Sequence, residues 1–502
     1  MKAIMVVGTT SHAGKSFLTS ALCRILAREG IRVTPFKGQN MALNAYVTES
    51  GGEIGHAQAV QAWAAKTQPR VEMNPILLKP QGNMTSQVII KGQVAGITSA
   101  QNYYRQYFHR GWKAITESLA ILKQNYDVIV CEGAGSPAEI NLKHRDLTNM
   151  RVAKYLNAKT ILIVDIDRGG AFAHVVGTLA LLDPDERSLI KGIVINKFRG
   201  ALSLLESGIR WLEDYTGIPV LGVIPWTERL LPPEDSLDLL ERQKSCDYRD
   251  LTIKVIRLPY IANFTDFDPL AAENTVSLEY IHPDEMLGHP DAVIIPGSKT
   301  TISDLRVLEK SGMARQLQQY AAQGGTILGI CGGFQMLGEK VLDLEGLEGD
   351  QTSYLGLNLL PTVTTITRNK ITRQRKTISY YPEQCLPIEG YEIHQGRTEL
   401  ITAKFQREKF IFDDSSLGIV NEAQTIWGCY LHGLLDNSCW RRSWLNLLRS
   451  KRGLEALPNG VANYQQQREA TLEAIADFVA ANLDLSLVEE LKTHDRANTL
   501  FA

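Results

Sequence analysis

Short apolar runs alternate with longer amphipathic segments through the first 230 residues of the chain. The runs are rich in Val and Ile and lack the period-two alternation of a half-exposed strand, which favours strands buried on both faces. Segments between them, such as residues 16–30, have helical periodicity. This order predicts a parallel, doubly wound α/β sheet. Its predicted strands are residues 3–8, 32–36, 127–133, 160–167, 192–198 and 219–225.

A polar stretch with two prolines and many charges, residues 231–250, interrupts this pattern and predicts a linker. Strand–helix alternation then resumes, so we expect a second α/β sheet. Residues 361–412 are rich in Thr, Arg and Lys and predict more exposed β structure, and residues 468–485 predict a helix. The second sheet's predicted strands are residues 251–260, 291–297, 326–333 and 425–433. The predicted division is a first domain at 1–230, the linker, a second domain at 251–450 and a helical extension at 451–502.

Composition narrows the class of protein. With 502 residues the chain is long enough for two cores. A formal net charge of −2 gives no global attraction to nucleic acid, so an anionic substrate needs a local basic site. Seven scattered cysteines without metal-binding spacing favour a reducing compartment. No apolar stretch approaches the ~20 residues of a membrane span. We therefore expect a cytoplasmic protein that binds neither nucleic acid nor membrane.

The first chemical motif is GTTSHAGKS, residues 8–16, between a predicted buried strand and a helix. Such a turn directs backbone N–H groups and the positive helix end toward phosphate. Lys15 is expected to reach the β and γ phosphates, and the Ser16 hydroxyl to bind Mg²⁺. Thr10 and Gly14 complete the candidate nucleotide contacts. The spacing is G-x5-GKS, one residue longer than the standard P-loop, and a surface turn is the alternative.

Polar residues at the ends of other strands support a ligand site, because open α/β sheets bind ligands at the carboxyl ends of their strands. Lys37 is a further nucleotide candidate. Glu132, in CEGAGS, where nearby glycines leave room for a ligand, is a candidate Mg²⁺ ligand or else a solvated charge. Asn196 is a candidate contact to the base, although a strand-end Asn often only caps a turn.

The second motif is GICGG, residues 329–333, which follows an apolar strand and precedes a helical pattern. It is a cysteine version of the nucleophile elbow, and the helix N-terminus favours a thiolate on Cys331. The backbone N–H groups of Gly332 and Gly297 are candidate oxyanion donors. His432, in CYLHG, is the candidate base and acid. The alternatives are an inert buried cysteine and a structural histidine.

Ten sequence blocks together resemble the cobyric acid synthase family, over about residues 1 to 450. In chain order they are GTTSHAGKS, PFKGQNMALN, LLKPQGNMTSQVI, DIDRGGAFA, INKFRG, NFTDFDPL, PGSKTTISDL, GICGGFQMLG, GYEIHQGRT and YLHG.

The resemblance implies a dethiobiotin-synthetase-like P-loop domain joined to a class I glutamine amidotransferase-like domain, both α/β. It implies ATP- and Mg²⁺-dependent amidation of the b, d, e and g carboxylates of adenosylcobyrinic acid a,c-diamide, each through an acyl phosphate. The expected small-molecule partners are therefore the corrinoid, glutamine and ATP. Carried over by motif, Cys331 is the glutaminase nucleophile and His432 its partner. The basic residues Lys79, Arg105, His109 and Arg110 either face the acidic corrinoid or are solvated loop charges.

Two positions depart from related patterns. Many class I amidotransferases have a Glu two residues after the His, where this chain has Leu434, a departure that cobyric acid synthases share; the orienting partner of His432 is left unidentified. The family's NKFRGD block ends here in Ala201, which puts a contact from that position in doubt.

Two other functions compete with this interpretation. A cobyrinic acid a,c-diamide synthase has similar domains, but its aspartate-containing GPDYID-like block is replaced here by GQNMALN, residues 38–44. A MinD-like ATP switch with an inactive amidotransferase domain is the alternative from another class, and the intact elbow at Cys331 argues against it.

Overall fold

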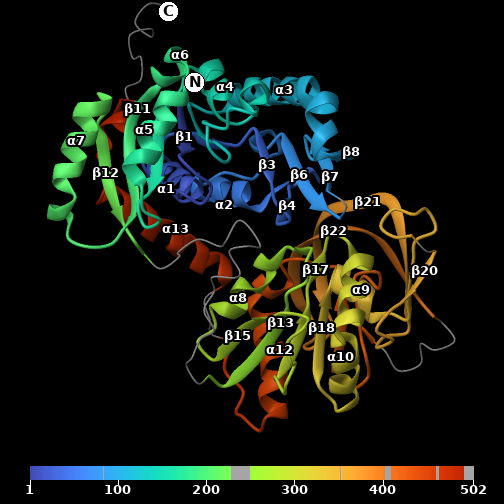
Figure 1. The fold of residues 1–502 in the computed structure, drawn as a ribbon. Coiled ribbons are helices and arrows are strands. Elements are labelled where there is room, and N and C mark those ends of the chain that lie inside the picture. Colours follow the sequence, from blue (N-terminus) through green and yellow to red (C-terminus); the bar gives the residue numbers. More distant parts are fainter. Residues whose placement is uncertain (83, 228–248, 351, 402–408, 460–462, 491–502) are drawn as a thin grey trace, which may run out of the picture.

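A parallel sheet with strand order β12-β11-β10-β1-β9-β2 forms the centre of the first domain of the computed structural model (Figure 1). Residues 1–502 are described except 83, 228–248, 351, 402–408, 460–462 and 491–502. The strands are β1 (Lys2–Gly8), β2 (Val33–Phe36), β9 (Val128–Glu132), β10 (Lys159–Asp165), β11 (Ile190–Phe198) and β12 (Val220–Pro225). The predicted strands of this sheet are confirmed, with ends that differ by one or two residues.

Both faces of this sheet are buried, which explains the unbroken apolar runs. Successive side chains of β1 point to opposite faces: Ile4 and Val6 join one apolar cluster, and Met5 and Val7 join the other. Helices cover both faces. They are α1 (Lys15–Arg28), α2 (His56–Ala64), α3 (Ala100–Asn125), α4 (Met150–Leu156), α5 (Ala171–Leu181), α6 (Pro184–Arg187) and α7 (Glu206–Thr216).

The C-terminal segment returns to the first domain. Helix α13 (Tyr464–Ala480) packs along α1, and buried Arg24 of α1 donates to Glu469 and Glu473 at 2.8 and 2.9 Å. Leu483 then forms an isolated bridge with Gly222 of β12, and the short α14 (Ser486–Glu489) follows. The predicted helix is therefore present, and its apolar side is part of the first domain's core.

A smaller sheet between β2 and α3 was not predicted as strands. Its order is β3-β6-β7-β8, and the two-stranded β4–β5 ladder lies beside it. The residues around 79–110, expected as loops, are strands and the N-terminal half of α3. Short strands with mixed polar and apolar residues give a weak sequence signal. The elements are β3 (Gln39–Met41), β4 (Ala45–Val47), β5 (Glu53–Gly55), β6 (Ile76–Gln81), β7 (Thr85–Ile90) and β8 (Gln93–Ser99).

The second domain has its own sheet, ordered β15-β13-β16-β18-β25-β24-β23, with its first five strands parallel. Its strands are β13 (Leu251–Ile256), β15 (Val276–Ile281), β16 (Ala292–Ile295), β18 (Thr326–Ile330), β23 (Lys409–Phe410), β24 (Gly418–Val420) and β25 (Ile426–Cys429). The helices are α8 (Asp268–Ala271), α9 (Thr301–Ser311), α10 (Met313–Ala322), α11 (Gly332–Leu337) and α12 (Ser438–Lys451). The predicted second α/β sheet is thus confirmed.

A long antiparallel hairpin of β21 (Thr362–Ser379) and β22 (Leu386–Leu400) continues into a side sheet with β19 (Lys340–Leu342) and β20 (Ser353–Leu355). The predicted β structure is correct here. The predicted exposure is wrong for the middle of β22, where residues 391–394 are buried because they face the other domain and the pocket beside it.

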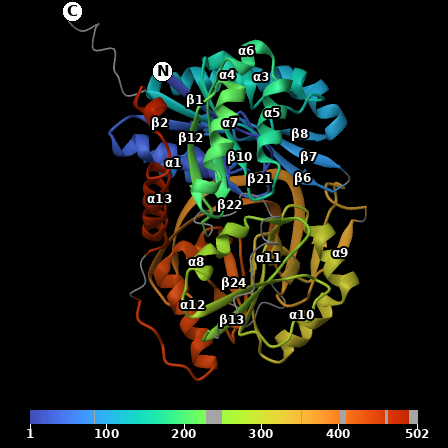
Figure 2. The same cartoon turned by 60° about the vertical axis from the view of Figure 1, so that its left-hand side comes forward.

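This hairpin and the β4–β5 ladder bring the two domains together (Figures 1 and 2). The Tyr391 hydroxyl donates to the Ala45 carbonyl at 3.1 Å, and the Ala45 N–H donates to the Asn263 side chain at 3.0 Å. Glu53 bonds Lys79 of its own domain at 2.8 Å and Lys370 of the other. The junction therefore combines buried hydrogen bonds and ion pairs with a small apolar cluster to which both domains contribute.

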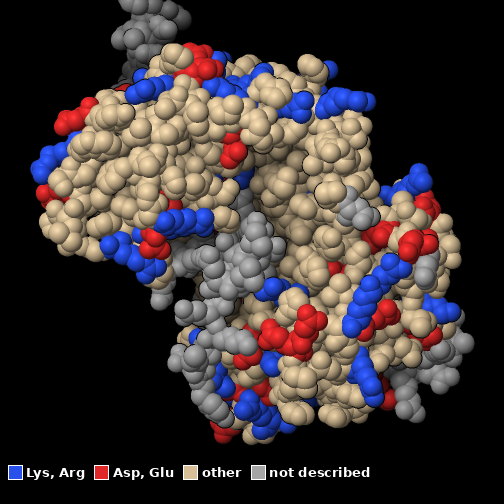
Figure 3. All heavy atoms as spheres, in the orientation of Figure 1, with Lys and Arg blue, Asp and Glu red and all other residues tan. Residues whose placement is uncertain are grey.

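Charges on the face seen in Figure 3 are mixed: basic and acidic side chains are interspersed over both domains. The small net charge is thus spread over this face without one broad basic area. In the described part of the chain, every helix is too short or too polar to cross a bilayer.

Replacing Ile475 by Ala tests the docking of α13. Ile475 is fully buried against α1, so Ile475→Ala should lower the free energy of unfolding by about 2–4 kcal/mol through lost contacts and a cavity. Urea unfolding followed by tryptophan fluorescence measures the loss. The exposed Gln466→Ala on the same helix is the control and should change little. An equal effect of both substitutions would contradict the packing described here.

Candidate functional site

The loop between β1 and α1 has the geometry of a phosphate cradle. Gly14, with φ 107°, precedes the first residue of α1, and a side chain there would come within 2.1 Å of the Asn196 amide. Only glycine fits both constraints. Lys15 Nζ donates to the carbonyls of Thr10 and Gly135, each at 3.1 Å, so its ammonium group lies over the loop. The open amides of the helix N-terminus face the same side.

Glu132 is the charged centre of this region. The Ser16 hydroxyl donates to its carboxylate at 2.8 Å, Lys37 Nζ donates at 2.9 Å, and the Gln61 amide also donates. Glu132 and Lys37 are both buried. A buried carboxylate persists as an anion when it is paired in this way. The structure therefore brings together three of the predicted residues, Ser16, Lys37 and Glu132, which come from α1, the end of β2 and the end of β9.

Asn196 has a different visible contact from the predicted one. Its amide donates to the Ala13 carbonyl at 2.9 Å, so it stabilises the conformation of the loop between β1 and α1. Its contact with a nucleotide base stays a prediction. Beyond it, Lys197 bridges the His12 carbonyl and Asp165 at 2.8 and 2.7 Å. Ala201, where the family pattern has an acid, is exposed at the end of the neighbouring loop.

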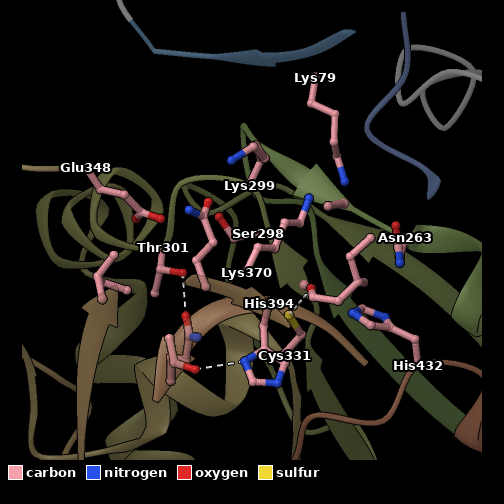
Figure 4. A pocket seen from close by; sticks show the side chains of 17 residues that line it. Lys79, Asn263, Ser298, Lys299, Thr301, Cys331, Glu348, Lys370, His394 and His432 are labelled. Atoms are coloured by element: carbon pink, nitrogen blue, oxygen red, sulfur yellow. Dashed lines mark hydrogen bonds between the residues drawn. The ribbon is translucent and has the colours of Figure 1, made fainter. Parts of the chain in front are cut away.

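Cys331 lies in the strained turn predicted for a nucleophile elbow. Its φ is 53° and ψ is −107°, between the end of β18 and the start of α11. A side chain at Gly333 would come within 1.9 Å of the Ile295 carbonyl, so the turn requires a residue without Cβ there. Backbone strain of this kind persists where the surroundings fix it and is frequent at active sites. The Cys331 thiol points into the pocket shown in Figure 4.

His432 lies beside Cys331 and contacts Asp266, the candidate for the orienting partner that the sequence left unidentified. Its Nδ1 is 2.6 Å from Asp266 Oδ2, and its ring interacts with the Cys331 thiol. Asp266 Oδ1 also accepts from the Gly433 N–H at 3.0 Å, which fixes the carboxylate. Burial disfavours a charged imidazole, but the charge and hydrogen bond of Asp266, together with the Cys331 thiol, outweigh burial and raise the pKa of His432.

Sequence reasoning missed Asp266, although it stands in the quoted block NFTDFDPL. Leu434, at the position where other amidotransferases have a Glu, is buried and apolar. Asp266 contacts His432 from a separate segment, the 3-10 turn of residues 264–267 that precedes α8. The signal available was an acid in a block that resembles the family pattern, which does not by itself indicate contact with a histidine 166 positions later.

Both glycines predicted as oxyanion donors border the elbow. A Cβ at Gly332 would lie 2.7 Å from the Ser298 N–H, and a Cβ at Gly297 would lie 3.3 Å from the His432 ring. The Gly297–Ser298 strand, β17, is held by Asp304, whose carboxylate accepts from the Ser298 hydroxyl at 2.6 Å. Burial raises the pKa of Asp304 to about 7. The role of both glycines as oxyanion donors stays a prediction.

The predicted basic group separates into two parts. Lys79 is buried at the domain junction and lines the Cys331 pocket. Arg105, His109 and Arg110 are exposed on α3. Burial opposes charge on Glu53, but Lys370 and Lys79 outweigh burial and lower the pKa of Glu53 to about 2. Lys79 is therefore occupied by an internal ion pair.

Comparisons with known proteins agree with both halves. Residues 4–237 match the profile of the CobQ/CobB/MinD/ParA nucleotide binding domain, and residues 252–440 match that of the CobB/CobQ-like glutamine amidotransferase domain. Three curated relatives, each called cobyric acid synthase, match 97% of this chain and 99% of their own length. They come from Rippkaea orientalis at 70% identity, Crocosphaera subtropica at 68% and Nostoc punctiforme at 66%. With this identity over almost the whole length, and with both domains present, the chain belongs to the cobyric acid synthase family.

Proposed function

We propose that this enzyme amidates the b, d, e and g carboxylates of adenosylcobyrinic acid a,c-diamide, using ATP in the first domain and ammonia released from glutamine in the second. The observation that carries the proposal is the pairing of two sites in one chain: the loop with Lys15 and Glu132, and the Cys331–His432–Asp266 group. The relatives' name supports the corrinoid as substrate. The amide-containing segment 38–44 favours this reaction over a,c-diamide synthesis.

Glutamine is hydrolysed at the turn that carries Cys331. The Cys331 thiolate attacks the side-chain amide carbon of glutamine, and backbone amides at Gly332 and Gly297–Ser298 stabilise the oxyanion. His432 then gives its proton to the leaving nitrogen, so ammonia departs and a thioester remains. Water, deprotonated by His432, cleaves the thioester to glutamate. Asp266 holds the imidazole in one orientation and stabilises its charged form.

The synthetase half activates the acceptor. A carboxylate resists ammonia because oxide is a poor leaving group. Transfer of the γ-phosphoryl group of ATP to a carboxylate oxygen gives an acyl phosphate and ADP; ammonia then attacks the acyl carbon and phosphate leaves. Lys15, Lys37 and the loop amides, with Thr10 and Gly14, bind and neutralise the phosphates.

Magnesium fits the oxygen donors at this site. Ser16 and Glu132 lie together at the helix N-terminus, and a hydroxyl with a carboxylate is a donor set that Mg²⁺ accepts. A bound Mg²⁺ supplies charge neutralisation on the phosphates there. The Ser16–Glu132 hydrogen bond holds the two donors in place.

Cys331→Ala tests the division of labour. The variant should release no glutamate from glutamine, because the nucleophile is absent, yet form amide product from high ammonia at nearly the wild-type rate. Mass spectrometry of the corrinoid follows four successive amidations. The exposed Cys439→Ala, on α12 of the same domain, is the control and should keep glutamine use. Loss of activity with ammonia as well would contradict separate roles for the domains.

Lys15→Ala tests the nucleotide loop. Removing the ammonium group that neutralises the transferring phosphate should lower amidation about 100-fold or more with either nitrogen source. ADP release measured with the a,c-diamide present reports the effect. The exposed Lys191→Ala, in the same domain, should behave as wild type. Retained amidation in Lys15→Ala would place the phosphates elsewhere.

Asp266→Asn tests the orienting role. Loss of the carboxylate should lower the glutaminase rate by about 10²–10⁴-fold, as loss of an orienting carboxylate does in other triads. Because the charge of Asp266 raises the pKa of His432, its removal should let the imidazolium lose its proton at lower pH. The basic limb of the rate–pH profile should then move toward lower pH. The exposed Asp284→Asn is the reference variant. A basic limb of Asp266→Asn that coincides with the limb of the reference would refute this role.

A further inference from the structure

The pocket around Cys331 contains more charged groups than the amide chemistry requires. Besides Cys331 and His432 it is lined by three lysines and one glutamate, namely Lys79, Lys299, Lys370 and Glu348 (Figure 4). The side-chain amide of glutamine is neutral, so none of these four charges is needed at the reacting end. The other end of free glutamine carries an α-carboxylate and an α-ammonium group.

Two of the three lysines are already paired. Lys79 donates to Glu53 of its own domain and Lys370 donates to Glu53 across the domain junction, and Lys370 also donates to Gln87 at 3.3 Å. Lys299 differs from them. Within the described residues, its ammonium group makes neither a hydrogen bond nor an ion pair, and the side chain is partly buried. Enclosure lowers the pKa of Lys299 to about 8, and the charge of Glu348 opposes this shift. The group therefore remains mainly charged at neutral pH.

The neutral polar groups of the pocket are also occupied. The Gln335 carbonyl accepts from the Thr301 hydroxyl at 2.7 Å, and its amide donates to Tyr430 at 3.3 Å. The His394 ring contacts the Gly396 carbonyl at 2.8 Å and Glu392 at 3.3 Å. These contacts hold the pocket wall in shape. Among the cations that line the pocket in the described part of the chain, Lys299 is therefore the one without a direct contact to a carboxylate.

Glu348 supplies a negative group near Lys299. Its carboxylate accepts from the Ile302 N–H at 3.2 Å, at the N-terminus of α9, where the helix favours an anion. Its own N–H donates to Asp343 at 2.8 Å, which fixes the loop that carries it. Burial raises the pKa of Glu348, and Lys299 opposes that rise. Figure 4 shows Lys299 and Glu348 on the same side of the pocket, with His432 on the opposite side of Cys331.

We propose that Lys299 and Glu348 recognise the amino-acid end of glutamine, Lys299 binding the α-carboxylate and Glu348 the α-ammonium group, and so select free glutamine as the ammonia donor. This inference rests on the proposed glutaminase function. The side chains of Lys299 and Glu348 are both partly buried. Partly enclosed charges that await opposite charges on a ligand discriminate between ligands, because an analogue lacking its charge leaves the protein group unpaired. Lys299 directly follows Ser298 of β17, the strand that carries the candidate oxyanion donor Gly297. Neighbouring residues therefore recognise the two ends of glutamine.

The test compares glutamine with 4-aminobutanamide, which lacks the α-carboxylate, and glutaramic acid, which lacks the α-amino group. Lys299→Met should lower kcat/KM for glutamine on the order of 100-fold, mainly through KM, and change kcat/KM for 4-aminobutanamide by less than about 3-fold. Glu348→Gln should show the same pattern with glutaramic acid as the insensitive substrate. Lys299→Arg should recover part of the activity. The exposed Lys310→Met, at the end of α9, is the matched control.

Equal loss with glutamine and 4-aminobutanamide, or no loss with either, would overturn the proposal. Failure of the wild type to hydrolyse glutamine would refute the proposed function instead. Lys299→Gln is the second variant if Lys299→Met folds poorly. Alkylation of Cys331, followed by intact mass, provides an independent measurement. The glutamine analogue 6-diazo-5-oxo-norleucine should react far more slowly with Lys299→Gln than with wild type, whereas iodoacetamide should react equally with both.

Discussion

The buried pair of His432 and Asp266 is the contact on which the proposed chemistry of the second domain depends. Two segments far apart in sequence meet there: the end of β25 and the turn before α8. Asp266 holds the imidazole through Nδ1 and the chain after it through the Gly433 N–H. Because the pair is enclosed, its attraction is little screened, and the other ring nitrogen is directed toward Cys331. The elbow supplies the sulfur, but this pair determines where the proton carrier lies.

The same segments form the contact between the domains. Asn263 and Phe264, just before Asp266, bond the Asn44–Ala45 segment of the first domain. Tyr391 stacks on the His432 ring, exchanges backbone hydrogen bonds with it, and reaches the Ala45 carbonyl with its hydroxyl. The proposed glutaminase group is therefore assembled at the junction of the two domains. This position matches a reaction in which ammonia must pass from one domain to the other while unprotonated.

The two candidate sites are built in a similar way. In each, a buried strand ends in a tight turn that opens a helix, and a glycine is required where a side chain would collide: Gly14 against Asn196, Gly333 against Ile295. The helix N-terminus then provides open amides, for phosphate in one domain and for an oxyanion in the other. They differ in their charges, since the first gathers lysines around Glu132 and the second gathers a thiol, an imidazole and Asp266.

The sequence by itself determined the α/β architecture and predicted the candidate reacting groups. Unbroken apolar runs identify strands covered on both faces, and GTTSHAGKS and GICGG mark the two turns, because glycine spacing and strand–turn–helix order are local properties. Only the tertiary structure revealed Asp266, the burial of β22 and the pairing of Lys79 with Glu53, since each depends on residues distant in sequence. A lone acid, a lysine on a short strand or a polar hairpin is compatible with exposure until folding places its partner beside it. The charges around Lys299 could likewise be interpreted only from the structure, because the pocket that they line is formed by residues from both domains.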